Sequence, residues 1–455
     1  MSDSNSQQQA GNPQGGAPRR WLFGALMLLL VAAGVEIGSR VILWGALGES
    51  LADLAARRSG LILEPGEGAP GYRYERDIQG FDNEVLHPFL GFVFDPAANE
   101  RERRRENDML EITRLGFFRL PGERPSYEGA DTQIGVFGGS VAMLFAFQGR
   151  EVLSERLGAA HPELGRLGVR SFALGGHKQP QALLTLNYLL ALGERVDIVV
   201  NLDGFNELAL SWFDNYQQRI FPPYPRAWRR RVEGIPSRSL LRLLARQDSV
   251  RRLRSSLAQA FETPGVRSVA AAQIVWLSVD RQLAAAHAEL QAAAQSAPSG
   301  GEDYSLQGPF APVESREELL RSLVDLWKRS SLQMHRLAEA NGMVYCHALQ
   351  PNQYDLGSKP LSTEEREKAY SIESPYREII ELGYPLLRRA GEEIRAQGAC
   401  FLDLSRAFEA VESTLYVDDC CHFGPGGNER LAEALADAVS ERLERRGAAQ
   451  RREAP

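Results

Sequence analysis

The chain lacks a basic excess: 52 Lys and Arg stand against 59 Asp and Glu, for a net charge of −7. This balance argues against a broad nucleic-acid-binding surface, and we expect no nucleic-acid partner. The sequence also has no phosphate-cradling loop with its lysine and no internal repeat, so no cofactor is expected. Only four cysteines occur, and none shows metal-ligand spacing, so no metal site is predicted. The four are Cys346, Cys400, Cys420 and Cys421, and their disulfide pairing cannot be deduced from spacing. The adjacent Cys420 and Cys421 are better suited to packing, or to bonding elsewhere, than to bonding each other.

Long apolar runs are absent except near the amino terminus. Residues 1–20 are mostly polar, which predicts a disordered tail. The run from Trp21 to Val35 is short for a bilayer, but its continuation past Glu36 and Arg40 makes residues 21–44 long enough to span one. We expect an uncleaved signal anchor, with a cleaved signal peptide or a buried core helix as alternatives. The Arg19–Arg20 pair favours a cytoplasmic amino terminus and an extracytoplasmic remainder.

Residues 45–130 have a mixed pattern, which predicts a juxtamembrane region and linker. The stretch from Gly60 to Gly80 is rich in Gly and Pro, and Arg114 to Arg119 resembles a short edge strand. The charged run from Arg101 to Arg105 is typical of a solvated surface rather than of an anion site. A charged tail is expected at residues 447–455.

From residue 131 to 446 the pattern changes to apolar, strand-like runs alternating with helical segments. Strands separated by helices indicate a parallel sheet with right-handed crossovers, and therefore an α/β fold. The closing helix is expected from Gly427 to about Glu444. The five predicted strands lie within Ile134–Ser140, Gly168–Gly176, Val196–Gly204, Met343–Gln350 and Cys400–Leu404.

Between the third and fourth strands, residues 208–342 do not follow this rhythm. Three stretches there have the amphipathic pattern of helices: Ser237–Phe261, Val269–Gln295 and Ser315–Ala340. We interpret them as a long helical insertion, which is either a lid over the carboxyl edge of the sheet or a packing extension.

Ser140 follows the first predicted strand in the sequence Ile-Gly-Val-Phe-Gly-Gly-Ser. Two glycines permit a tight turn, so this serine can be presented at the carboxyl edge of the sheet, where ligands bind in open α/β folds. Near the other end of the chain, Asp419 and His422 stand three residues apart before the last helix. A serine nucleophile needs such a base, and the base needs a carboxylate to orient it.

Donors for an oxyanion follow the other strands. Asn206 comes after the third strand, and a glycine, either Gly175 or Gly176, comes after the second. An amide side chain and a glycine N–H can both stabilise a developing negative charge.

These blocks, in this order, resemble the SGNH/GDSL hydrolase superfamily. The resemblance covers Thr132 to Arg445 without the insertion, and it implies a flavodoxin-like, three-layer α/β/α fold. It assigns Ser140 as the nucleophile, His422 as the base and Asp419 as its partner. It also assigns three donors to the oxyanion hole: the backbone N–H of Ser140, that of Gly176, and the side-chain amide of Asn206. Gly-Gly-Ser departs from the usual Gly-Asp-Ser, and Glu207 stands where Asp is commoner, which we expect to matter little.

Three further residues are candidates for substrate binding: His177, beside Gly176, and Gln350 and Asn352, which leave the fourth strand. A polar turn is the alternative for the last two, and His347 is expected to be structural. The sequence thus predicts a membrane-tethered serine esterase in a bacterial inner membrane, facing the periplasm and acting on acyl esters of envelope carbohydrate or lipid. Two alternatives are a polysaccharide O-acyltransferase with the same triad and a non-catalytic envelope scaffold.

Overall fold

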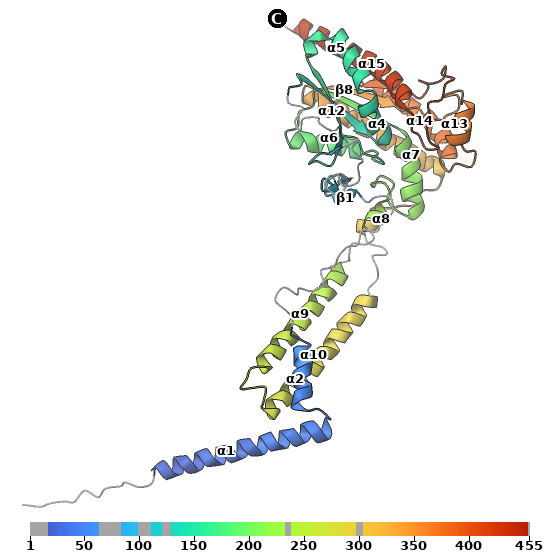
Figure 1. Ribbon diagram of the computed structural model, residues 1–455. Helices are drawn as coiled ribbons and strands as arrows, with labels where there is room; N and C mark the ends of the chain where they lie inside the picture. The colour runs from blue at the N-terminus through green and yellow to red at the C-terminus, as the bar shows by residue number, and fades with distance from the viewer. Residues whose placement is uncertain are drawn as a thin grey trace, which may run out of the picture. The chain divides into compact units, whose positions relative to one another are not determined.

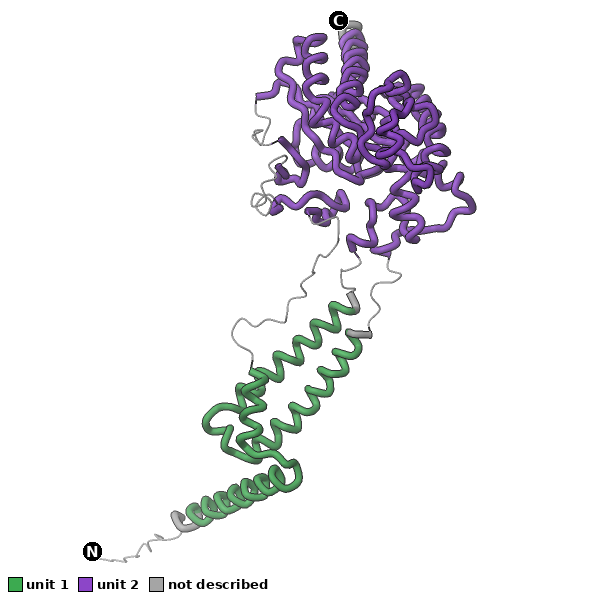
Figure 2. Tube along the Cα trace, turned by 45° about the vertical axis from the view of Figure 1, so that its right-hand side comes forward, with its two compact units in different colours: residues 1–74, 235–300 green, residues 75–234, 301–455 purple. Residues whose placement is uncertain are grey.

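The computed structural model describes residues 17–62, 83–98, 111–120, 129–232, 238–296 and 304–453. Most of the expected polar tail, the Gly- and Pro-rich linker after residue 62 and the charged run at residues 101–105 lie outside them. The chain forms two compact units, coloured separately in Figure 2. One unit combines residues 1–74 with 235–300, and the other combines residues 75–234 with 301–455.

The second unit is built on a five-stranded sheet in the order β6-β5-β7-β8-β9, with every neighbouring pair parallel. In chain order this is 2-1-3-4-5, the order of flavodoxin-like folds. The α/β fold predicted from the sequence is therefore confirmed. The strands are β5 (Thr132–Gly138), β6 (Leu167–Ser171), β7 (Ile198–Asp203), β8 (Val344–Leu349) and β9 (Cys400–Asp403).

Helices cover both faces of this sheet (Figure 1). Successive residues of a strand point to opposite faces. On β7, Val200 packs in one apolar cluster with Phe145 and Leu157, whereas Val199 packs in another with Leu186 and Met334. The first face carries α4 (Ser140–Gln148), α5 (Arg150–Ala160) and α15 (Pro425–Glu453), and the second carries α6 (Gln181–Ala191), α12 (Arg316–Ala340) and α14 (Tyr376–Ala396).

Two short antiparallel pairs precede the sheet in the chain and belong to the same unit. Leu90, Val93 and Phe117 pack in the cluster under α6. This part of the expected 45–130 linker is therefore part of the sheet unit, and the predicted edge strand at Arg114–Arg119 is instead one arm of a small hairpin. The pairs are β1 (Glu84–His87) with β2 (Gly91–Phe94), and β3 (Glu111–Ile112) with β4 (Phe118–Arg119).

The predicted helical insertion is divided between the two units. Its last helix, α12, belongs to the sheet unit and packs on one face of the sheet. Trp327 of this helix is fully buried. The other two helices, α9 (Arg238–Phe261) and α10 (Ala270–Ser296), belong to the first unit. The remaining short helices of the sheet unit are η3 (Pro162–Leu164), α7 (Phe205–Leu210), η4 (Ser211–Asn215), η5 (Tyr216–Gln218), α8 (Trp228–Val232), α11 (Tyr304–Gln307) and α13 (Thr363–Lys368).

In the first unit, α9 and α10 pack against α2 (Leu51–Ser59). Leu54 and Trp276 are buried in its apolar core. The fully buried Arg58 pairs with Glu262 at 2.7 Å and donates to Gln273. An amphipathic pattern identifies such helices but not the surface against which they pack, which explains why their partner was not predicted.

The amino-terminal apolar helix also belongs to the first unit and comprises α1 (Ala17–Val41) and η1 (Ile42–Ala46). Residues Trp21–Ala46 are long and apolar enough to cross a membrane, with a mean hydropathy of 2.0 and little burial. A signal sequence would have the same properties. Within the unit, the Glu36 carboxylate accepts the backbone N–H of Ala270 at 2.8 Å.

Two of the four cysteines are joined across the sheet. Cys346 of β8 and Cys400 of β9 occupy paired positions and form a disulfide, with a Cα–Cα distance of 4.7 Å. Cys420 and Cys421 are free, and both pack against the main apolar cluster.

Candidate active site

Ser140 is the first residue of α4. It follows Gly138, the last residue of β5, and Gly139. Gly138 has φ +138°, and a Cβ there would lie 2.1 Å from the carbonyl oxygen of Leu202. A Cβ on Gly139 would lie 2.1 Å from Nδ2 of Asn206. Neither position accepts a side chain, so the Gly-Gly pair is required for β5 to turn into the helix and place Ser140 at the carboxyl edge.

His422 lies in the loop between β9 and α15. Residues Tyr416 and Phe423 form an antiparallel bridge, and the N–H of Val417 donates to the carbonyl of His422 at 3.0 Å. The segment is therefore a small hairpin whose tip carries residues 418–422. We call it the histidine loop.

The side chains of Ser140 and His422 meet across 282 positions of sequence: Nε2 of His422 lies 2.6 Å from Oγ of Ser140. Nδ1 of the same imidazole is hydrogen-bonded to a carboxylate oxygen of Asp418. A serine, an imidazole and a carboxylate thus form a continuous chain of hydrogen bonds. This arrangement can move a proton from the hydroxyl to the ring while the carboxylate stabilises the imidazolium.

The carboxylate beside His422 is Asp418 and not Asp419, so the residue expected as the orienting partner is corrected. Asp418 Oδ1 accepts the N–H groups of Cys420, Cys421 and His422 at 3.0, 3.1 and 3.1 Å, which wraps the loop around this side chain. Asp419 is exposed. Burial would raise the pKa of Asp418, but the hydrogen bond and charge of His422 and the backbone donors outweigh it and lower the pKa to about 2. Asp418 therefore remains ionised at neutral pH.

Three consecutive residues after β8 fix the backbone of the histidine loop. Asn352 Nδ2 donates to the carbonyl of Cys420 at 3.1 Å, Gln353 Nε2 to that of Asp418 at 3.0 Å, and the Tyr354 hydroxyl to that of Asp419 at 3.0 Å. We call residues 352–354 the loop clamp. It connects the loop that carries the base to a central strand of the sheet.

Asn206 is the second residue of α7, directly after β7, and Gly176 lies in the turn that follows β6. Because a Cβ on Gly139 would lie only 2.1 Å from Asn206 Nδ2, the Asn206 amide lies directly beside the residue that precedes Ser140. Asn206 Nδ2 donates one hydrogen bond to the carbonyl of His177 at 2.8 Å. This bond ties the start of α7 to the turn that contains Gly176, which has φ +82°. Two of the expected oxyanion donors, Asn206 and Gly176, are thus on adjoining segments.

Glu207, the next residue of α7, connects the same two segments through its carboxyl group. Its carboxyl oxygens accept the N–H of Gln179 at 2.9 Å and that of Gly204 at 2.8 Å. Burial raises the pKa of Glu207 to about 8, and the charge of Asp203 adds to the rise. From the sequence we expected the identity of this residue to matter little, but its place beside Asn206 makes it the support of the predicted oxyanion hole.

The three residues expected to bind substrate are buried. His177 is 1% exposed, and its Nε2 contacts the carbonyl of Phe92 at 3.2 Å; burial lowers the pKa of His177 to about 3. Asn352 has no exposed surface and serves in the loop clamp. Gln350 is 3% exposed. Their positions at the sheet edge were predicted, but Phe92 of β2 covers His177, and Asn352 is bonded to the histidine loop.

A second serine–histidine–aspartate chain lies inside the fold. His347 Nε2 is 2.8 Å from Asp203 Oδ1, and His347 Nδ1 is 2.8 Å from Ser331 Oγ. All three side chains are at most 2% exposed. No ester can reach a serine in this position, so we assign the group to the core, in agreement with the expectation for His347.

Arg226 lies against the predicted oxyanion turn and was not singled out from the sequence. Its Cδ would be 2.5 Å from a Cβ on Gly176, and its Nε donates to Asp214 at 2.9 Å. Tyr376 packs its ring against Phe205, the neighbour of Asn206, at 5.3 Å. Both residues come from segments between the recognisable blocks, where the sequence carries no signal of a site.

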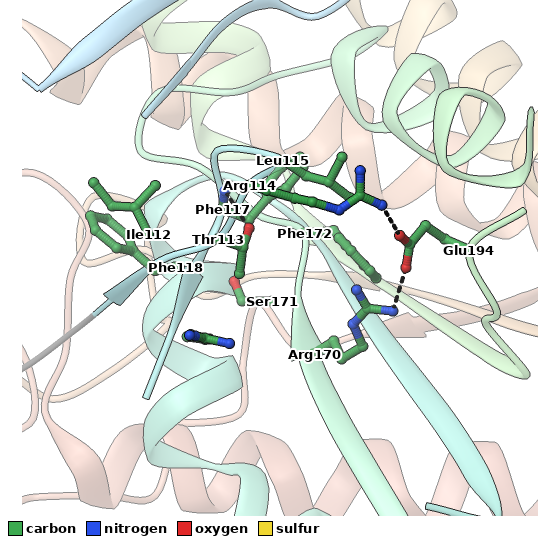
Figure 3. Close-up of a pocket in the computed structure, with 11 residues that line it drawn as sticks. Ile112, Thr113, Arg114, Leu115, Phe117, Phe118, Arg170, Ser171, Phe172 and Glu194 are labelled. Carbon is green, nitrogen blue, oxygen red and sulfur yellow. Dashed lines mark hydrogen bonds and ion pairs between the residues drawn. The ribbon is translucent and has the colours of Figure 1, made fainter. Parts of the chain in front are cut away.

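A separate recess of about 180 Å³ lies between the β3–β4 hairpin and β6. Figure 3 shows Arg114 and Arg170 directed at the same carboxylate, Glu194, at 3.4 and 3.0 Å. None of the residues lining the recess belongs to the Ser140 group, so we do not include it in the candidate active site.

No protein-family model and no curated protein matches the chain. Solved structures similar to it include Axe2, an acetylxylan esterase from Geobacillus stearothermophilus, with 12% identity over 68% of this chain and 95% of that chain and a TM-score of 0.31. A mutant of the same Axe2 has 11% identity over the same shares and a TM-score of 0.32. At an identity and a TM-score this low, neither the activity nor the substrate of Axe2 can be assigned to this chain.

Proposed function

We propose that this chain is a serine esterase of the SGNH type. The observation that carries the proposal is the alignment of Ser140 Oγ, the two ring nitrogens of His422 and the Asp418 carboxylate. It does not rest on the solved structures. A hydroxyl is almost fully protonated at neutral pH, and this arrangement supplies the base that makes it a nucleophile.

In the proposed reaction, Ser140 Oγ attacks the carbonyl carbon of an ester while its proton passes to Nε2 of His422. The tetrahedral oxyanion accepts hydrogen bonds from the N–H of Ser140 and Gly176 and from Nδ2 of Asn206. His422 then gives its proton to the departing alcohol, which leaves an acyl group on Ser140. Water, deprotonated by the same ring, attacks the acyl-enzyme, and the carboxylic acid leaves.

We further propose that the enzyme is tethered to a bacterial inner membrane and faces the periplasm. The apolar helix over Trp21–Ala46, preceded by Arg19 and Arg20, supports this placement. The Cys346–Cys400 disulfide agrees with an oxidising compartment. Acyl esters of envelope carbohydrate or lipid are the substrates within reach of such a tether.

An aryl acetate tests the reaction, with and without an oligosaccharide acceptor. We expect release of the phenol and of free acetate, and loss of both in the Ser140→Ala variant. If acetylated oligosaccharide accumulates faster than free acetate, the chain is an acyltransferase that uses the same residues. If the folded protein releases no more phenol than Ser140→Ala does, the proposal fails.

A further inference from the structure

The histidine loop brings three metal-binding side chains together beside Ser140. One donor atom each from Cys420, Cys421 and His422 lies within 4.8 Å of the others. The two sulfur atoms are 3.3 Å apart and are not bonded to each other. This group was not predicted from the sequence, because three adjacent residues do not have the usual spacing of metal ligands.

The backbone of this group is already fixed. Asp418 Oδ1 accepts the N–H of all three residues, and Asn352 holds the carbonyl of Cys420. Binding would therefore require little ordering of the chain, which lowers the entropic cost of coordination. Cys420 is half-buried, which leaves the group open to solvent on that side, whereas Cys421 is 1% exposed.

We propose that Cys420, Cys421 and His422 form an inhibitory site for a thiophilic metal ion, for which Zn²⁺ is the probe. Two thiolates and an imidazole suit Zn²⁺, with a water molecule as the fourth ligand. On binding, two S–H bonds break, their protons go to solvent, and two S–Zn bonds and one N–Zn bond form. If the ring nitrogen is Nδ1, its N–H proton moves to Nε2.

Inhibition follows from the contacts that His422 already makes. Its Nε2 faces Ser140 and its Nδ1 faces Asp418, so a metal ion on either nitrogen replaces one of these hydrogen bonds. Without the first bond the serine has no base, and without the second the base has no oriented partner. This consequence rests on the proposed function, whereas metal binding itself does not.

Binding is tested on the full-length Ser140→Ala protein, kept reduced with a phosphine. Co²⁺ serves as a spectroscopic substitute for Zn²⁺. We expect one equivalent of Co²⁺ to produce a thiolate-to-cobalt charge-transfer band, which Zn²⁺ removes and which is lost in Cys420→Ser. Asp419→Asn, in the same loop, is the matched control and keeps the band. No band, or the same band in Cys420→Ser, overturns the site. So does a peptide containing Cys420 and Cys421 that is two hydrogens lighter than its dithiol form after phosphine treatment, because that would show a Cys420–Cys421 disulfide apart from the Cys346–Cys400 disulfide.

The inhibitory effect is tested with the aryl acetate. Zn²⁺ should reduce the hydrolysis rate of the unmodified chain by at least about tenfold, and a chelator should restore it. The rate of Cys420→Ser, relative to its own metal-free rate, should change much less. An equal loss in both proteins overturns the inhibitory role. If no protein hydrolyses the ester, the proposed function fails, and the cobalt titration still decides whether the metal site exists.

Discussion

Asn352 Nδ2 donates to the carbonyl oxygen of Cys420 at 3.1 Å. A residue just after strand β8 therefore holds the loop that carries His422. Asn352 is fully buried and 68 positions away from Cys420 in the chain. The position of the base is therefore fixed by the sheet as well as by its own loop.

Asn352→Ala should reduce kcat because the histidine loop loses one of its three clamping bonds. A displacement of about 1 Å at a catalytic group costs on the order of 10²-fold in rate, and we expect a loss of this size. Gln350→Ala is the matched control: it is also a buried amide after β8, but it is not one of the three residues of the loop clamp. Equal losses of kcat in the two variants would show that the effect comes from the core and not from the clamp.

Asp418→Asn should remove most of the activity, and Asp419→Asn should leave it nearly intact. An amide at position 418 favours the wrong tautomer of His422 and cannot stabilise the imidazolium, a change that costs about 10⁴-fold in kcat in serine hydrolases. Steady-state kinetics of the two purified variants provide the comparison. A larger loss in Asp419→Asn would reverse our assignment of the carboxylate.

Asp418 should also make the stability of the fold depend on acid pH. Its pKa is 3.8 in the unfolded reference and about 2 in the folded chain. Ionised Asp418 therefore stabilises the folded state above about pH 4, and this contribution is lost as pH falls toward 2. Thermal unfolding at pH 5 and pH 3 should show a larger drop in Tm for the unmodified chain than for Asp418→Asn. Identical drops would mean that Asp418 is not paired in the folded protein.

Asn206→Ala should lower kcat by about 10²- to 10³-fold with little change in KM, the usual effect of removing one oxyanion donor. Gly139→Ala should cause a similar loss, because its Cβ would lie 2.1 Å from the Asn206 amide and displace it. If both changes act through the same donor, the double variant should lose no more than the worse single variant. Additive losses would place the effect of Gly139 elsewhere.

Much of the sheet was predictable because its strands are short apolar runs that end at glycine or a polar residue. β5 and β7 are buried along their whole length, and their last residues bring Ser140 and Asn206 to the same edge. Local pattern was sufficient for these strand ends because the topology of parallel strands fixes where they meet. The pairing of Ser140 with His422 was predicted from the resemblance to the SGNH/GDSL superfamily instead.

The orienting carboxylate could not be chosen from the sequence, because Asp418 and Asp419 are adjacent and both suit the role. The choice depends on how the loop folds, and the loop clamp that holds its backbone lies about 65 residues earlier in the chain. The burial of His177 has a similar origin, since Phe92 of β2 covers it. These contacts connect segments that no local pattern relates.

Reaction of Ser140 with a fluorophosphonate tests the central claim most directly. The reagent forms a covalent adduct only with a serine that a neighbouring base activates. We expect one adduct per chain, located by mass spectrometry on Ser140, absent from Ser140→Ala and much slower to form in His422→Ala. A folded chain that takes up no label, or labels equally well without His422, would contradict the account.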